Sequence, residues 1–160
     1  MKSENFTKVG LSSGLALAFI LAAAQPAFAK VQVGSLACTA GASGGVIVLT
    51  EQELKCVFEP ANGEPQDYVG EVRKFGLDIG VTGGTQMQWL VFAETADWDP
   101  STLGGTYVGV SADAALGIGG GVNVLLGGTD GSVVLQPVSV QEEVGLEVAL
   151  GITDLQLTRV

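Results

Sequence analysis

The stretch Glu53-Leu54-Lys55-Cys56-Val57-Phe58-Glu59 decides the fold, because it alternates between two kinds of side chain. Leu54, Cys56 and Phe58 occupy one phase, and the other phase carries the charged residues together with one valine. Successive side chains of an extended chain point to opposite faces of a sheet. The stretch therefore predicts a half-buried β-strand that directs Cys56 toward a core.

The second cysteine, Cys38, lies in a segment with the same alternation. Leu36 and Cys38 share one phase of the predicted strand Val31–Cys38, so both thiols are expected on the buried side of a strand pair. Two cysteines in an exported chain are typical of one structural disulfide, and no Cys-x-x-Cys redox motif is present. We predict a structural Cys38–Cys56 bond.

Short alternating segments separated by turn residues fill the rest of the chain, which is typical of all-β proteins. The predicted strands are Val31–Cys38, Val46–Leu49, Glu53–Glu59, Tyr68–Phe75, Leu77–Val81, Gln86–Phe92, the long run Thr106–Leu126 with a bend at Gly119-Gly120-Gly121, Val133–Val140, Glu147–Leu150 and Leu155–Val160. Pro137 suggests an edge position or a bulge. Many glycines lie inside these segments, where a strongly coiled sheet needs close backbone approach. We expect an all-β fold of roughly eight to ten short strands, forming a small antiparallel β-barrel or a barrel-like sandwich.

The N-terminal segment has the three parts of a secretory signal peptide. Lys2 and Lys8 are basic, residues 10–24 are an apolar run that we expect to form the signal helix, and Ala27-Phe28-Ala29 offers small residues for cleavage. The apolar run is shorter than the ~20 residues of a membrane-spanning helix. We predict a signal peptide over residues 1–29, cleaved after Ala29, and a single β domain over residues 30–160 in the bacterial periplasm or secreted.

The net charge of the chain restricts the classes of molecule that it can bind. The formal net charge is −10 at pH 7, and removal of the signal peptide makes the mature chain more acidic still. Such a chain repels nucleic acid and anionic membrane surfaces, so no nucleic-acid partner is expected and membrane association is not favoured. A small outer-membrane barrel stays an alternative, although aromatic residues make up only 6% of the chain, too few for two aromatic girdles.

The sequence offers little catalytic chemistry. It contains no histidine, which excludes Ser-His-Asp and Cys-His catalysis and the common zinc sites. No glycine-rich phosphate-binding motif stands between a strand and a helix. We therefore expect no cofactor, no metal site and no enzymatic activity.

Three groups of residues are nevertheless candidates for a function. Trp98, between Asp97 and Asp99 in an irregular stretch, is the best candidate for an exposed aromatic that contacts a ligand or partner, and Tyr107 is a further candidate. The acidic loop around Asp97 and Asp99 lacks the spacing of a calcium loop and is expected to be solvated. Asp78 and Asp113 interrupt apolar strand segments, so either carboxylate would need a partner if it pointed inward.

Several short motifs follow one another in an order that is found in a known family. They are Val33-Gly34-Ser35-Leu36-Ala37-Cys38, Lys55-Cys56-Val57-Phe58, Tyr68-Val69-Gly70, Lys74-Phe75-Gly76-Leu77-Asp78-Ile79-Gly80, Gly105-Thr106-Tyr107-Val108-Gly109 and Leu135-Gln136-Pro137-Val138-Ser139-Val140-Gln141. With the signal peptide, they resemble the domain of unknown function 992 family of exported bacterial proteins, over essentially the whole mature chain. The resemblance implies a location in the bacterial envelope. It implies no activity and transfers no functional residue.

Two classes of function follow from these observations. The leading hypothesis is a non-enzymatic binding or structural module of the cell envelope. It would hold a small apolar ligand or lipid in the barrel, or dock an envelope protein through the loop that bears Trp98. The rival is a carboxylate-based hydrolase that uses Asp78, Asp97 or Asp99, which would need two inward carboxyl groups in one cleft, one with a raised pKa.

Overall fold

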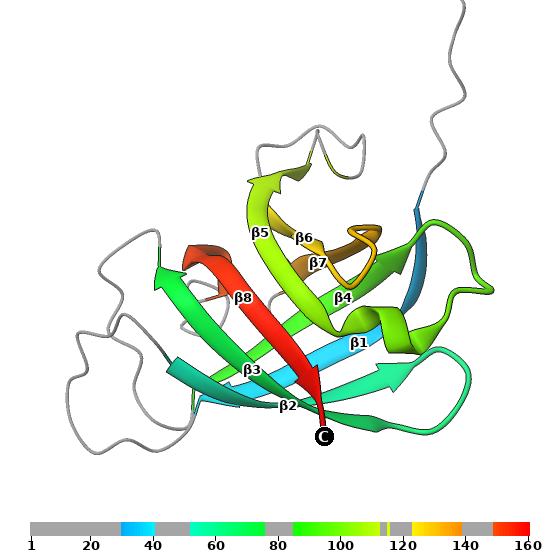
Figure 1. Cartoon of the computed structure of the whole chain (residues 1–160), viewed down its shortest axis with the longest axis horizontal. Helices are drawn as coiled ribbons and strands as arrows, with labels where there is room; N and C mark the ends of the chain where they lie inside the picture. Colours follow the sequence, from blue (N-terminus) through cyan, green and yellow to red (C-terminus); the bar gives the residue numbers. More distant parts are fainter. Residues whose placement is uncertain (1–29, 41–51, 76–84, 113–114, 116–122, 139–148) are drawn as a thin grey trace, which may run out of the picture.

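The computed structural model describes residues 30–40, 52–75, 85–112, 115, 123–138 and 149–160. They form a closed antiparallel β-barrel with the strand order β1-β2-β3-β8-β5-β6-β7-β4 (Figure 1). The strands are β1 (Val31–Ala40), β2 (Gln52–Pro60), β3 (Gln66–Phe75), β4 (Gln86–Ala93), β5 (Gly105–Ser111), β6 (Asn123–Gly127), β7 (Val133–Val138) and β8 (Ile152–Arg159). A short 3₁₀ helix, η1 (Pro100–Leu103), precedes β5. The predicted all-β barrel is confirmed.

The barrel consists of two Greek keys. In the first, β1, β2 and β3 are sequential neighbours, and β4 returns to pair with β1. In the second, β5, β6 and β7 are sequential neighbours, and β8 returns to pair with β5. Each set therefore has the spatial order 4-1-2-3 that defines the motif. The β3–β8 and β4–β7 pairs join the two sets and leave the sheet without a free edge.

The strand that first indicated the fold has the expected alternation. Leu54, Cys56 and Phe58 are buried, and their neighbours Glu53 and Lys55 are exposed. Cys56 lies opposite Cys38 in the register of β2 and β1, and the two form the predicted disulfide. The apolar residues of a strand thus determine which of its side chains point into the barrel, as in any sheet with one buried face.

Side chains fill the interior of the barrel. The largest fully buried ones come from all eight strands and η1, and include Trp89, Tyr68, Tyr107, Phe58, Leu36, Leu54, Met87, Leu103, Leu125, Leu135, Leu155 and Leu157. An eight-stranded barrel is just wide enough for its own side chains to fill. The described residues therefore form a packed core instead of an open lumen.

Two strand predictions were wrong in part. Residues 149–151 are helical where a strand over Glu147–Leu150 was expected, and Ala112 and Ala115 are helical within the run Thr106–Leu126, which was expected to be extended. Alanine and leucine are strong helix formers, and they adopt a helical turn once the pairing of a strand ends. The predicted strands Val46–Leu49 and Leu77–Val81 lie outside the described residues, as does the bend at 119–121.

Pro137 lies in β7 opposite Trp89 of β4. The described pairing between β7 and β6 runs only from Val133 to Leu135. Pro137 follows this pairing, so its missing N–H group falls at a local edge. No bulge interrupts the described β7 pairings.

Candidate functional site

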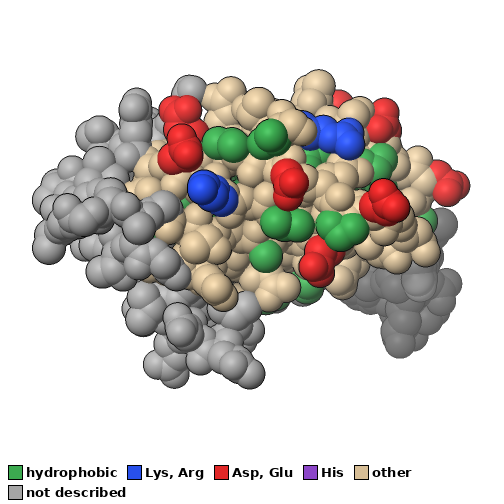
Figure 2. All heavy atoms as spheres, turned by 90° about the horizontal axis from the view of Figure 1, so that it is seen from below, with side chains coloured by type: hydrophobic (Ala, Val, Ile, Leu, Met, Phe, Trp, Pro, Cys, Tyr) green, Lys and Arg blue, Asp and Glu red, His purple; other side chains and the backbone are tan. Residues whose placement is uncertain are grey.

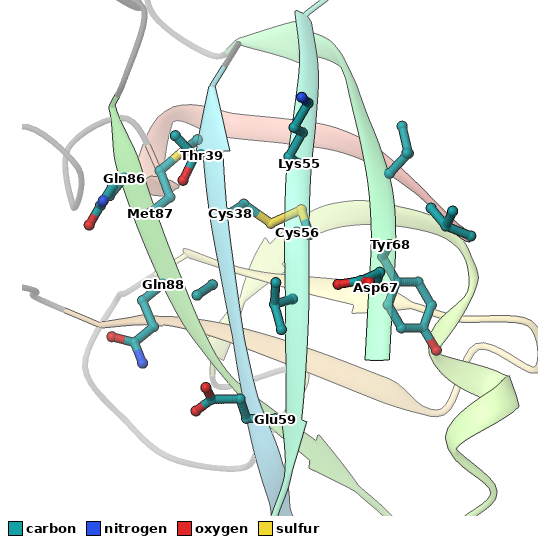
Figure 3. A pocket seen from close by; sticks show the side chains of 14 residues that line it. Cys38, Thr39, Lys55, Cys56, Glu59, Asp67, Tyr68, Gln86, Met87 and Gln88 are labelled. Carbon is teal, nitrogen blue, oxygen red and sulfur yellow. A yellow bond between two sulfur atoms is a disulfide. The ribbon is translucent and has the colours of Figure 1, made fainter. Parts of the chain in front are cut away.

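A groove of about 780 Å³ lies on the outer surface of β4, β1, β2 and β3 (Figure 3). The exposed phase of these four strands supplies most of its lining. We call this hollow the outer groove, and its lining residues are Ala37, Cys38, Thr39, Lys55, Cys56, Val57, Glu59, Asp67, Tyr68, Val69, Gln86, Met87, Gln88 and Val160.

Two cross-strand rows of side chains form the floor of the outer groove. The register of the four strands places Gln88, Ala37, Val57 and Asp67 in one row. It places Gln86, Thr39, Lys55 and Val69 in the next row. Residues that lie directly opposite in an antiparallel pair have Cβ atoms about 4.5–5.5 Å apart, so the members of a row are neighbours.

Small side chains on β1 account for the depth of the groove. Ala37 and Thr39 stand between the longer glutamine side chains of β4 and the side chains of Lys55 and Val57 on β2. A short side chain between long ones lowers the surface at that strand. Val57 is 39% exposed, which is unusual for a large apolar residue in this structure.

The groove is apolar at the centre of its first row, at Ala37 and Val57, and polar at the centre of its second row, at Thr39 and Lys55. Lys55 is its one basic side chain, while Glu59 and Asp67 supply carboxylates. Apolar side chains lie among acidic and basic ones on the molecular face seen in Figure 2. Such a mixture of apolar and polar side chains is typical of protein-binding surfaces.

The disulfide lies beneath the groove. Cys38 and Cys56 are almost fully buried, and each follows or precedes a floor residue, Ala37 or Val57, along its strand. Gly70 on β3 leaves room for the bond, because a Cβ atom there would lie 3.3 Å from the Cys56 Sγ atom. The bond therefore fixes β1 against β2 directly under the floor of the groove.

The loop that bears Trp98 closes one end of the barrel. Trp98 is half-buried and packs edge-on against Phe58 of β2, with ring centroids 5.8 Å apart and planes at 89°. Edge-to-face contacts of this kind stabilise aromatic pairs. Leu103 of η1 is fully buried in the core.

Two tyrosines anchor η1 from inside the barrel. The Tyr107 Oη atom donates a 2.6 Å hydrogen bond to the Leu103 carbonyl, and the Tyr68 Oη atom donates a 3.2 Å bond to the Pro100 carbonyl. β3 and β5, which carry these tyrosines, both pair with β8. Burial raises the pKa of both phenols, so both are neutral donors at neutral pH.

Asp99 has a structural role in the same loop. Its side chain accepts a 2.9 Å hydrogen bond from the Ser101 backbone N–H and caps η1. Hydrogen bonds from Ser101 lower the pKa of Asp99. Asp97 is exposed, and the described residues contain no cluster of three potential metal ligands.

The candidates predicted from the sequence do not gather in one site. Asp97 and Asp99 lie exposed on the closing loop, Trp98 is half-buried beside them, and Tyr107 is in the interior. Asp78 and Asp113 lie outside the described residues. The outer groove was not predicted from the sequence. The feature that could have indicated it is Val57, an apolar residue in the charged phase of its strand.

A comparison with protein families agrees with the order of motifs along the chain. The family described as protein of unknown function DUF992 matches residues 17–158. The chain belongs to this family. Comparisons of this DUF992 member with curated proteins and with solved structures gave no significant match. No described helix of this DUF992 member has the length and apolar character needed to cross a bilayer.

Proposed function

We propose that this DUF992 member is an exported, non-enzymatic binding module that docks a protein partner in the outer groove. The observation that carries the proposal is the groove itself, in which the apolar side chains of Ala37 and Val57 lie on a disulfide-fixed strand pair, with the carboxylates of Glu59 and Asp67 nearby. A rigid surface loses little conformational entropy when it binds, which favours recognition.

The packed interior favours this proposal over a carrier of an apolar ligand. A ligand pocket of drug size usually needs a cavity of about 300–1,000 Å³. The described core is occupied instead by Trp89, Phe58, Tyr68, Tyr107 and many leucines. The outer groove has a volume of about 780 Å³, within the range of binding sites.

The chemistry of the groove favours an extended, basic segment of the partner. An apolar side chain of that segment would cover Ala37 and Val57, and a Lys or Arg would lie toward Asp67 or Glu59. The net charge of −10 attracts such a segment at long range and raises its association rate. Lys55 would face a carbonyl or carboxylate of the partner.

An envelope location supports the same proposal. A disulfide persists in oxidising compartments and is rare in the cytoplasm. The Cys38–Cys56 bond is therefore consistent with an exported chain. Cleavage after Ala29 is part of the proposal, and N-terminal sequencing of the exported protein tests it.

Neither alternative has comparable support. A carboxylate hydrolase needs a carboxyl group with a raised pKa, whereas the pKa of Asp99 is lowered by hydrogen bonds that cap η1. An outer-membrane barrel turns apolar side chains toward lipid, whereas the outer phase of β2 carries Glu53, Lys55 and Glu59.

Site-specific photocrosslinking tests the proposal. A photoreactive residue is placed at Val57 in the exported protein, and at exposed Asn62, outside the groove, as the control. We expect an adduct with one defined partner from position 57 and none from position 62. The partner is then purified, and Val57→Glu should weaken its binding at least tenfold. Equal adducts at both positions, no adduct at either, or unchanged binding by the variant would overturn the proposal.

A further inference from the structure

The charged residues of the strands are confined to one side of the barrel. β5, β6, β7 and β4, which are adjacent in the sheet, contain no Asp, Glu, Lys or Arg. All charged strand residues belong to β2, β3 and β8, which are adjacent on the other side. We call the outer face of β5, β6, β7 and β4 the uncharged wall. Its lack of charge stands out in a chain with a net charge of −10.

The uncharged wall carries apolar side chains on its outer face. Val134 lies between Val133 and Leu135, which point into the core, so strand alternation directs Val134 outward. It is nevertheless fully buried, in a second apolar cluster separate from the core. The other members of this cluster are Ala112, Val124, Phe92, Val110, Ala115 and Leu126. These four strands therefore have apolar residues on both faces.

The chain covers this second cluster only in part. Ala112 and Ala115, from the helical residues that follow β5, pack within it. Phe92, Val110 and Leu126 stay half-buried at its margin. Val108, the outward residue before Val110 in the β5 alternation, is 48% exposed. An apolar surface thus continues from the covered cluster to Val108.

We infer that the uncharged wall docks against the same wall of a second copy of this chain. Two copies of a strongly acidic protein repel each other wherever their charged faces meet. The strands of the uncharged wall bring no charged residue of their own to such an interface. β1 is uncharged as well but lies beside the charged strand β2, and Asp154 of β8 lies opposite Val108 at the edge of the wall. A two-fold interface sets one patch against itself, and interface cores are depleted in charged residues.

The lengths of the strands argue against a lipid bilayer as the occupant. A strand that crosses a bilayer needs about 9–11 residues. β5 (Gly105–Ser111), β6 (Asn123–Gly127) and β7 (Val133–Val138) are all shorter. The wall shares β4 with the outer groove, but the two test positions lie on different strands, Val108 on β5 and Val57 on β2, so self-association and partner binding are tested separately.

Sedimentation velocity of the exported protein over a concentration series tests the inference. The test variant is Val108→Glu, and the matched control is Val57→Glu, because both valines are exposed on outer strand faces, at 48% and 39%. We expect a wild-type dimer, a dimer dissociation constant raised at least tenfold by Val108→Glu, and an unchanged dimer for Val57→Glu. Added salt should strengthen the dimer, because it screens the repulsion between the acidic surfaces of the two copies outside the interface.

Three results would overturn the inference. The first is a wild-type protein that stays monomeric up to hundreds of micromolar, and the second is an equal effect of the two glutamate variants. The third is a monomer that binds phosphatidylethanolamine–phosphatidylglycerol vesicles in a Val108-dependent way, since lipid would then be the occupant. If Val108→Glu does not fold, as judged by circular dichroism, Val108→Ser replaces it and should weaken the dimer by a smaller but measurable factor.

Discussion

Cys38 and Cys56 lie directly opposite each other in the register of β1 and β2, with their Cα atoms 4.0 Å apart. Their disulfide joins two strands that already pair along most of their length. The disulfide lies beneath Ala37 and Val57, so it holds the two strands that carry these groove residues in a fixed relative position. A change in the bond should therefore affect both global stability and the groove.

Removal of the disulfide should destabilise the protein substantially. The bond closes a loop with a sequence separation of 18 residues, which corresponds to about 3 kcal/mol in the chain-entropy account. We expect the double variant Cys38→Ala/Cys56→Ala to lose about this amount in urea unfolding. Wild-type protein in excess reductant is the control and should approach the variant. Equal unfolding midpoints for oxidised wild type and variant would contradict the prediction.

The hydrogen bond from Tyr107 to η1 should contribute measurably to stability. Tyr107→Phe removes the 2.6 Å bond and leaves the buried Leu103 carbonyl without this donor. A lost buried hydrogen bond costs about 1–2 kcal/mol. Tyr68→Phe is the matched control, because the one hydroxyl proton of Tyr68 has two more distant acceptors, at 3.2 and 3.3 Å, and we expect a smaller loss. Urea unfolding that ranks the two variants in the opposite order would show that η1 is held by packing instead.

The ionisation of Tyr107 should lower the free energy of unfolding at alkaline pH. Burial raises the pKa of Tyr107 above its ordinary value of 10.0, so the folded protein keeps a proton that the unfolded chain loses. The contribution of Tyr107 to stability should therefore be constant below about pH 9 and fall as the pH rises past 10, by about 1.4 kcal/mol per pH unit. Unfolding free energies of wild type and Tyr107→Phe at pH 8 to 11 test this. The variant should show the shallower decline, and parallel declines would exclude Tyr107 as the source.

Local patterns in the sequence were sufficient to predict the barrel and the disulfide. Leu54, Cys56 and Phe58 define the inward phase of β2 without any knowledge of neighbouring strands, because side-chain alternation is a local property. The phase of Cys38 follows in the same way, and two thiols on one face of a strand pair can bond. Each phase could be assigned within a single strand, and the pairing followed because the chain contains two cysteines.

The groove and the closing loop could not be predicted in this way, because they depend on contacts distant in sequence. Ala37 lines a groove only because β4 pairs with β1 on one side while β2 pairs on the other. Trp98 stays a candidate for contact with a ligand or partner, and its packing on Phe58 of β2 is a contact that the sequence did not predict. Sequence composition around Trp98 indicates a polar loop and contains no information about which ring it meets.

The contact between β6 and β5 should be especially sensitive to a single methyl group. A Cβ atom at Gly127 would lie 2.7 Å from the Tyr107 Cα atom, on a backbone that cannot move without disturbing the tyrosine anchor of η1. We expect Gly127→Ala to destabilise the protein by about 2 kcal/mol or more, as overpacking against a rigid backbone does. Gly109→Ala, in β5, is the matched control, because its Cβ atom would meet Thr153 at an ordinary distance of 3.4 Å. Thermal unfolding of the two variants side by side separates steric overlap from the general cost of replacing a strand glycine. If both variants unfold at the same temperature, close backbone approach is not the reason for glycine at position 127.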